Sequence, residues 1–350
     1  MGGIVSRSFI FNFDRHETVS ERLSLFVGIP LAALLVLYLW TDPFRCIHPF
    51  DINDTDPTNR EYLSTELFLR NENSQDYNSF IFSSSRGCGL NTYRWKTYLP
   101  SDARPFIFQA WSETLTGVEL KMDYLDNNNV PIENALIMLD IPGSFDKVQL
   151  PIAALSMKHF LFTGKTRFAY NVIQFYNFIQ RPSLWLSSAK KTLRHRKEQC
   201  CSDTISNDWD KNNRYTYDRV PDQDSLRDCS EISRQSFFAK IAHRGNDQIE
   251  IAEALITKKY EEQLRHIKSI LDRNNTDYYV ILSPAYCYSN PAVNLVDLKK
   301  LKTIFGEDRV CDFTGKNSMT DDYNNFTDPN HFGQRVGWMI LEEIYKKKLK

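Results

Sequence analysis

Three consecutive serines follow a short apolar stretch in the first third of the chain. The segment FIFSSSRGCG, residues 80–89, ends its apolar run at Ser83, Ser84 and Ser85. In open parallel α/β sheets, reactive groups gather just beyond the carboxyl ends of the strands. A serine between a strand and a helix also meets backbone N–H groups that favour a developing negative charge. This position therefore suits a nucleophile. A serine that only caps a helix is the alternative, and on these residues alone it is favoured.

A second group of chemically capable residues lies near the end of the chain. The segment NNFTDPNHFGQ contains Asp328 and His331, which form the only D-x-x-H pattern in the sequence. A histidine can accept the proton of a serine hydroxyl when a carboxylate holds its other ring nitrogen. A spacing of three residues lets one loop present both groups. Together with the serine loop, the pair predicts serine-dependent acyl chemistry.

The two segments together resemble a known family. IFSSSRG, followed by DPNH shortly before a closing helix, is similar to the SGNH or GDSL-type hydrolases, and most of all to their membrane-anchored serine-variant branch. That branch resembles the D-alanyl lipoteichoic acid and alginate-type O-acetylation proteins. The likeness covers residues 76–145 and 275–350. It implies that Ser85 is the nucleophile, Asp328 the orienting acid and His331 the base.

The serine segment departs from the family pattern at two positions. Ser84 stands where the first block of the family has aspartate, and Ser83 stands where it has glycine. Arg86 follows the nucleophile position, and two alternatives stay open for it. Its guanidinium could bind an anionic substrate or pair with a carboxylate of the protein.

The oxyanion hole implied by the resemblance is altered as well. The segment QAWSET, residues 109–114, has Ser112 where the family supplies a glycine, and LDIPGS, residues 139–144, lacks the family's third-block asparagine. The candidates for stabilising the oxyanion are therefore the N–H groups of Ser85, Arg86 and Ser112.

Strand-like and helix-like segments alternate through most of the chain after residue 75. Periodicity predicts strands at 78–84, 104–110, 134–141 and 278–284, and helices at 114–128, 166–180, 246–274 and 332–350. This alternation predicts a mostly parallel sheet covered by helices. With the resemblance, the expected fold is a three-layer α/β sandwich of the SGNH or flavodoxin-like kind. Residues 150–245 break the rhythm and are interpreted as an insertion or lid.

An uncharged run near the N-terminus predicts attachment to a membrane. Residues 23–40, LSLFVGIPLAALLVLYLW, are at the lower limit of a membrane-spanning helix. A cleaved signal peptide fits less well because a long segment precedes the run. Flanking arginines favour a cytoplasmic 1–22 and an extracytoplasmic remainder, as in a single-pass inner-membrane protein. Residues 41–75 are interpreted as a linker that leads to a folded domain at 76–350.

The charge balance gives no support for nucleic-acid binding. The 350 residues carry a formal net charge of −1, and the basic segments at 190–197 and 346–350 are short. We interpret both basic segments as solvated surface.

Metal and cofactor sites are not expected. Seven cysteines are too few for a disulfide-built scaffold, and no C-x-x-C pair or histidine cluster suggests zinc. Asp321 and Asp322 could bind a cation, but a solvated loop is favoured. The pairing of the cysteines stays open.

Aromatic residues gather in and after the predicted helix at 166–180. Three interpretations stay open for them, namely a glycan cleft, a membrane surface and ordinary packing, of which packing is favoured. The residues are Phe168, Tyr170, Phe175, Tyr176, Phe178 and Trp185.

The expected function is a membrane-anchored serine esterase or O-acyltransferase. The resemblance implies an acylated glycan or another ester as the substrate, with a membrane-bound O-acyltransferase as a further partner. The alternative is a non-catalytic envelope protein of the same fold that binds a glycan or a membrane partner. The missing asparagine and the altered second block favour this alternative.

Overall fold

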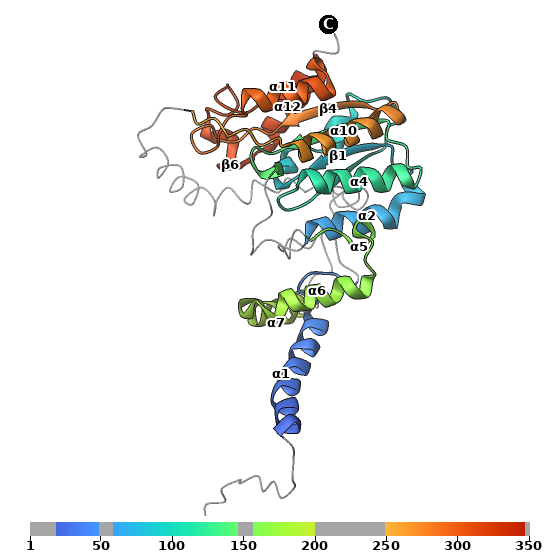
Figure 1. The fold of residues 1–350 in the computed structure, drawn as a ribbon, viewed down its shortest axis with the longest axis vertical. Helices are drawn as coiled ribbons and strands as arrows, with labels where there is room; N and C mark the ends of the chain where they lie inside the picture. The colour runs from blue at the N-terminus through green and yellow to red at the C-terminus, as the bar shows by residue number, and fades with distance from the viewer. Residues whose placement is uncertain (1–18, 49–58, 146–156, 200–248, 347–350) are drawn as a thin grey trace, which may run out of the picture. The chain divides into compact units, whose positions relative to one another are not determined.

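The computed structural model of the chain describes residues 19–48, 59–145, 157–199 and 249–346 (Figure 1). The chain divides into two compact units. One unit combines residues 1–43 with 175–200, and the other combines residues 44–174 with 201–350.

The larger unit is built around a sheet of five parallel strands. The strand order is β2-β1-β3-β4-β5. This order reverses direction between β1 and β3, as in doubly wound α/β sheets that bind ligands beyond that switch point. The strands are β1 (Ser79–Ser83), β2 (Pro105–Gln109), β3 (Asn134–Leu139), β4 (Asp277–Leu282) and β5 (Val310–Asp312). The predicted parallel sheet is confirmed.

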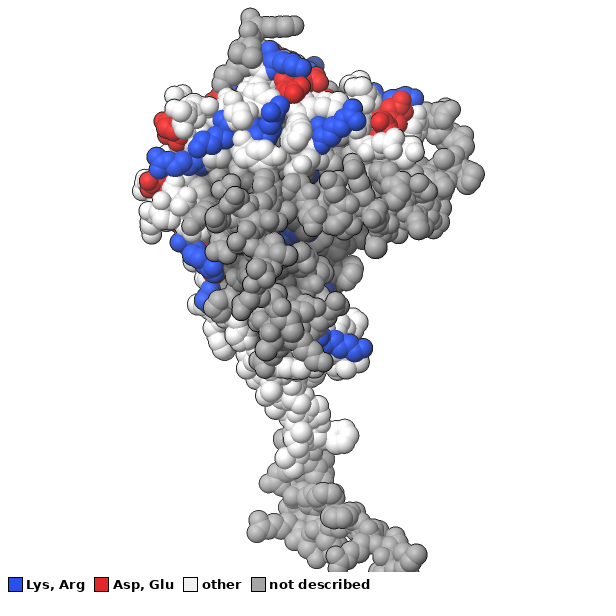
Figure 2. Space-filling view, turned by 180° about the vertical axis from the view of Figure 1, so that it is seen from behind, with Lys and Arg blue, Asp and Glu red and all other residues white. Residues whose placement is uncertain are grey.

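Charged side chains of both signs are present on the surface of this unit. Figure 2 shows Lys and Arg with Asp and Glu beside several of them. The unit also has ion pairs on its surface, such as Arg265–Glu261 at 2.8 Å. Such pairs contribute little to stability. The packing of the sheet must therefore hold the unit together.

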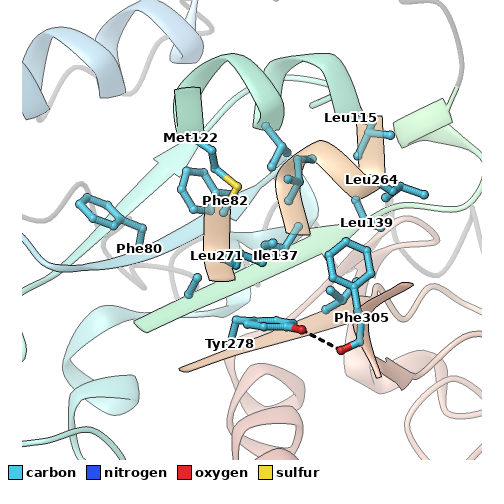
Figure 3. Close-up of a cluster of buried hydrophobic side chains, with 14 of the residues drawn as sticks. Phe80, Phe82, Leu115, Met122, Ile137, Leu139, Leu264, Leu271, Tyr278 and Phe305 are labelled. Atoms are coloured by element: carbon cyan, nitrogen blue, oxygen red, sulfur yellow. Dashed lines mark hydrogen bonds between the residues drawn. The ribbon is translucent and has the colours of Figure 1, made fainter. Parts of the chain in front are cut away.

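Helices cover both faces of the sheet and make it the middle of three layers. Phe80 and Phe82 of β1 point to one face, and Ile81 points to the other, as the alternation of a strand requires. The first face is covered by α2 (Arg60–Gln75), α4 (Leu115–Asn127), α10 (Lys258–Arg273) and α11 (Leu295–Phe305). Figure 3 shows part of this core, including the hydrogen bond from the Tyr278 hydroxyl to the Phe305 carbonyl, at 2.7 Å.

The opposite face carries the helix that follows the D-x-x-H segment. Side chains of α12 (Gln334–Lys346), including Val336 and Ile340, are fully buried against Ile81 and its neighbours. The short helix α3 (Thr92–Lys96) packs there too, and its Trp95 donates a hydrogen bond from Nε1 to the Tyr345 hydroxyl at 2.7 Å. The sheet therefore fixes the start of α12, where His331 lies just upstream.

The linker predicted at 41–75 is wrong over its second half. Residues 60–75 form α2, whose Phe68 is fully buried against the sheet. Asn59 caps this helix by accepting a hydrogen bond from the backbone N–H of Tyr62 at 3.2 Å. The last residues of α2, NENSQ, are polar, so the average composition of 41–75 resembles that of a linker. The apolar residues that α2 buries lie in its first turns. Residues 49–58 lie outside the described residues.

The long helix predicted at 246–274 is shorter than expected. It begins at Lys258, because Thr257 caps it and accepts from the Tyr260 backbone N–H at 3.4 Å. Residues 252–257 belong to neither a helix nor a strand. The Ala252 backbone N–H donates to the Ala292 carbonyl at 2.8 Å. The apolar residues before the cap have helical spacing only over a short window.

The predicted insertion forms helices where the structure describes it. These are α5 (Phe160–Thr163), α6 (Arg167–Ile179) and α7 (Pro182–Gln199). The rest of the insertion, at 150–156 and 200–245, lies outside the described residues.

The run predicted as a membrane anchor, residues 23–40, lies within α1 (Val19–Thr41). Over the part of the chain that the structure describes, no helix has the length and the apolar composition needed to cross a membrane.

Candidate active site

The structure brings Ser85, His331 and Asp328 together. The Ser85 hydroxyl oxygen lies 2.8 Å from Nε2 of His331, and Nδ1 of the same ring lies 2.6 Å from Oδ2 of Asp328. These distances are within hydrogen-bonding range for both contacts. The arrangement has the order of a serine nucleophile, an imidazole base and an orienting carboxylate.

Ser84, not Ser85, has the capping role. Ser85 is the first residue of the short 3-10 helix η1 (Ser85–Gly89), and Ser84 precedes it as the cap. The Ser84 hydroxyl accepts a hydrogen bond from the Arg86 backbone N–H at 3.0 Å. The adjacent Ser85 hydroxyl is therefore left to contact the imidazole. The capping interpretation holds for one serine of the loop and leaves the nucleophile position with its neighbour.

A two-stranded hairpin presents the acid and the base. Asp328 ends β6 (Phe326–Asp328) and pairs with His331, the first residue of β7 (His331–Phe332). The backbone N–H of Asn330 donates to Oδ1 of Asp328 at 2.8 Å. Burial alone would raise the pKa of Asp328, but the hydrogen bonds and charge of His331 and this backbone N–H outweigh it and lower the pKa. The carboxylate is therefore held ionised beside the imidazole.

The turn of the hairpin is attached to the segment after β4. The carbonyl oxygen of Pro329 accepts hydrogen bonds from the Tyr286 backbone N–H and from Nδ2 of Asn290, both at 2.9 Å. These bonds hold the hairpin turn at the carboxyl edge of the sheet, the edge at which β1 delivers Ser85. The position of the imidazole is therefore set by the sheet and not by the hairpin alone.

Asp140 directly follows β3, and its carboxylate contacts the serine loop. The Ser84 hydroxyl donates a hydrogen bond to the Asp140 carboxylate. Nε of Arg86 lies 3.8 Å from Oδ2 of Asp140, and the Arg86 side chain is only 12% exposed. Nη2 of Arg86 also donates to Oδ1 of Asn290 and to Oδ1 of Asn330, at 3.3 Å each. Of the two alternatives for Arg86, pairing with a carboxylate is present in this geometry, and substrate binding stays a prediction.

Two of the three oxyanion candidates keep a backbone N–H that is not engaged. The Arg86 N–H donates to the Ser84 hydroxyl, whereas no described residue accepts from the backbone N–H of Ser85 or Ser112. Ser83 of β1 pairs with Gln109 of β2, so both loops leave the same edge of the sheet. Ser112 has a φ of +48°, a left-handed conformation that favours glycine. Ser112 thus adopts a backbone conformation that glycine reaches more readily than serine.

A buried charge cluster holds the residue after Ser112. The carboxylate of Glu113 pairs with Lys121 and Lys158, and Lys121 also lies 2.6 Å from Oε2 of Glu61. Burial would raise the pKa of Glu113, but the two lysine charges outweigh it and hold the pKa well below its usual value. Breaking such a buried pair is costly, which fixes the start of α4 and the loop before it.

Sequence reasoning did not identify four residues that support the serine loop. They are Gln109, Asp140, Asn290 and Asn330, and Gln109 donates from Nε2 to the Ser84 carbonyl at 3.4 Å. A signal for Asp140 was present. It ends the strand beside β1, at the switch point where site residues gather. The two asparagines had no comparable signal, because their loops are placed only by the tertiary fold.

No family model matches this chain. Comparison with curated proteins gives no match either. The SGNH or GDSL resemblance therefore stays a prediction from the serine and D-x-x-H segments.

Metal-binding clusters are absent from the residues that the structure describes. Asp321 and Asp322, considered for a cation, accept hydrogen bonds from other residues of the protein. Asp321 accepts from the Tyr288 hydroxyl at 2.8 Å, and Asp322 caps the turn at Asn324 at 2.9 Å.

Proposed function

We propose that this protein is a serine esterase or O-acyltransferase of the SGNH or GDSL type that acts through an acyl-enzyme at Ser85. The observation that carries the proposal is the contact of 2.8 Å between the Ser85 hydroxyl and Nε2 of His331, with Asp328 on the other ring nitrogen. Hydroxyl, imidazole and carboxylate in this order form a constellation that recurs on unrelated folds for acyl transfer.

The first half of the reaction forms the acyl-enzyme. The Ser85 oxygen attacks the ester carbonyl while its proton passes to Nε2 of His331, and the Asp328 carboxylate stabilises the resulting imidazolium. The backbone N–H groups of Ser85 and Ser112 stabilise the tetrahedral oxyanion. The intermediate then collapses, the alcohol leaves with the proton from His331, and the acyl group remains on Ser85.

The second half of the reaction releases the acyl group. A water or a sugar hydroxyl gives its proton to His331 and attacks the acyl carbonyl, so that Ser85 leaves as the restored hydroxyl. Water as the acceptor gives hydrolysis, and a sugar hydroxyl gives transfer. Both outcomes use the same three side chains.

A membrane location is part of the same proposal. Residues 23–41 contain no charged side chain, and apolar side chains of α1 from Leu25 to Trp40 are largely exposed. A helix with apolar residues on all sides is typical of a membrane environment. Attachment through residues 23–40, with the sheet unit outside the cytoplasm, would bring Ser85 to an acylated envelope or secreted glycan. A membrane-bound O-acyltransferase is the partner that fits the transfer reaction.

Hydrolysis of short-chain chromogenic esters tests the proposal. We expect the purified chain to turn over p-nitrophenyl acetate, and Ser85→Ala or His331→Ala to lower kcat by about 10³-fold or more. The control is His266→Ala, which removes an exposed histidine of α10 that pairs with Asp123 at 2.7 Å and is not part of the triad. Activity that survives both triad substitutions would overturn the assignment.

The non-catalytic alternative has one observation in its favour. Asp140 directly follows β3, in the segment where the family has an amide donor, and an ionised carboxylate cannot donate a hydrogen bond to an oxyanion. A fluorophosphonate probe separates the two functions. The esterase proposal expects a covalent adduct on Ser85, found by mass spectrometry of the digested chain. An unmodified Ser85 in the folded protein, with no ester turnover, would leave the binding function as the better account.

A further inference from the structure

The outward side of α6 is apolar, although it faces solvent. We name this surface the α6 outer face and define it by Phe168, Val172, Ile173 and Tyr176. Phe168 is 79% exposed and Tyr176 is 59% exposed. A helix on the surface of a soluble domain has polar residues on its outward side. The α6 outer face therefore calls for an apolar neighbour that covers it.

The inward side of α6 is buried against other residues of the protein. Tyr170, Gln174 and Phe178, spaced four residues apart, are fully buried. The Tyr170 hydroxyl accepts from Nδ2 of Asn59 at 2.9 Å and from Nε2 of Gln174 at 3.3 Å. Packing is thus confirmed for Tyr170 and Phe178, and wrong for Phe168 and Tyr176. The helix has two apolar sides, of which the protein uses one.

The charge of the segment from α6 to the end of α7 indicates what kind of surface covers the α6 outer face. Residues 168–197 contain six Lys and Arg and no Asp or Glu, in a chain whose formal net charge is −1. Lys190 of α7 is exposed, and so is Leu186, at 73%. An apolar helix side flanked by basic residues is typical of a helix that lies at the surface of an anionic membrane. The segment 190–197, interpreted from sequence as plain solvated surface, belongs to this pattern.

The connection to α1 points to the same neighbour. Within the smaller unit, the Tyr38 ring of α1 packs against Phe175 and Phe178, with centroids 5.3 and 5.5 Å apart. Nε1 of Trp185 donates to the Phe178 carbonyl at 2.9 Å and ties α7 to the end of α6. The end of α6 is therefore held against the helix with exposed apolar side chains, labelled α1 in Figure 1. Trp185 is only partly buried, and Trp is enriched at the membrane–water interface.

We propose that the α6 outer face and the basic helix α7 lie on an anionic lipid bilayer, with the apolar side chains in the boundary between headgroups and acyl chains. This contact is separate from the anchor proposed at 23–40 and from the esterase reaction. It would hold the α6–α7 pair parallel to the membrane surface. A protein partner on the same face is the competing occupant, and the experiment below distinguishes it.

Site-specific photocrosslinking of the full chain tests this contact. p-Benzoylphenylalanine is placed at position 168 or 176, and at position 171 as the control on the same helix, where Asn171 is partly buried. The protein is reconstituted in nanodiscs of phosphatidylcholine with about one-third phosphatidylglycerol, since anionic headgroups attract basic segments. We expect lipid adducts at 168 and 176 several-fold above those at 171, and fewer in pure phosphatidylcholine or at high salt.

The same method separates this proposal from the anchor. A probe at position 29, on the exposed side of α1, reports on the anchor alone. Lipid adducts at 29 without adducts at 168 or 176 would overturn the surface contact and leave the anchor in place. Adducts at 168 and 176 with none at 29 would support the surface contact and remove the anchor. Crosslinks from 168 or 176 to protein in native membranes, in place of lipid, would overturn the lipid assignment.

Discussion

Gly337 of α12 lies directly against the backbone of Gly89 at the end of η1. A Cβ atom on Gly337 would be 2.0 Å from the carbonyl oxygen of Gly89, a distance that no side chain can occupy without a shift of the backbone. This contact joins the turn that carries Ser85 to the helix that follows His331. Two segments from opposite ends of the sequence can approach this closely only because both positions lack a side chain.

Substitution of Gly337 should therefore open the site. We expect Gly337→Ala to lower the free energy of unfolding by about 1–3 kcal/mol, because the added methyl group forces η1 and α12 apart. Ester turnover should fall as well, since the Ser85 hydroxyl moves away from the imidazole. Urea denaturation and kcat measure the two effects. The control is Gly143→Ala, whose Cβ would meet nothing closer than 3.5 Å. Equal effects of the two substitutions would contradict the role of the contact.

The different roles of Ser84 and Ser85 should appear in the free energy of unfolding of their alanine variants. Ser84→Ala removes a helix cap and leaves the buried Asp140 without its hydroxyl donor, so we expect a loss of about 1–2 kcal/mol in unfolding free energy. Ser85→Ala should change stability by less than about 0.5 kcal/mol while abolishing turnover. A large stability loss from Ser85→Ala would instead assign it a structural role.

The acid dependence of stability should show the ionised state of Asp328. Its pKa is lowered on folding, so its carboxylate stabilises the folded chain above the ordinary value of about 3.9, and this stabilisation is lost as the pH falls through the lowered value. Urea midpoints from pH 5 to pH 2 should show the advantage of the wild type over Asp328→Asn shrinking with acid. Asp308→Asn, at an exposed carboxylate, is the control. A pH-independent advantage would contradict the prediction.

Glycine should fit the backbone conformation at position 112 better than the native serine does. Its φ of +48° costs a non-glycine residue about 1–2 kcal/mol, of which the extra chain entropy of glycine offsets roughly 0.4–1 kcal/mol. We therefore expect Ser112→Gly to stabilise the fold slightly and to retain turnover, because the backbone N–H remains. Ser269→Gly, in the ordinary helix α10, should destabilise the protein by about 0.5–1 kcal/mol. A loss of turnover in Ser112→Gly with the fold intact would assign the hydroxyl, not the N–H, to catalysis.

The elements with strong local signals were predicted well. The strands at 78–84, 104–110, 134–141 and 278–284 appear within a residue or two, because short apolar runs bounded by turn residues have few other folds available. The helix α11 and the strand β5 were not predicted from the sequence. Six of the eleven residues of α11 are apolar and have helical spacing, so this helix could have been predicted, whereas β5 has only three residues and is defined by its pairing with β4.

The triad could be predicted from residue types and spacing, but its support could not. Asp328 and His331 share one loop, so their proximity is a local property of the sequence. The contacts of Arg86 with Asn290 and Asn330 join positions more than 200 residues apart, and nothing in those segments signals them. The sequence also could not predict that Phe168 is exposed while Tyr170 is buried, because both sides of α6 carry aromatic and aliphatic residues.

The separation of the two reactive groups along the chain has a consequence for biosynthesis. Ser85 and His331 are 246 positions apart, and the imidazole reaches the hydroxyl only when the β6–β7 hairpin rests on the completed sheet. On the proposed mechanism, the nascent serine has no proton acceptor beside it until at least 246 further residues have been synthesised. Reactivity therefore begins only after the β6–β7 hairpin has docked on the sheet.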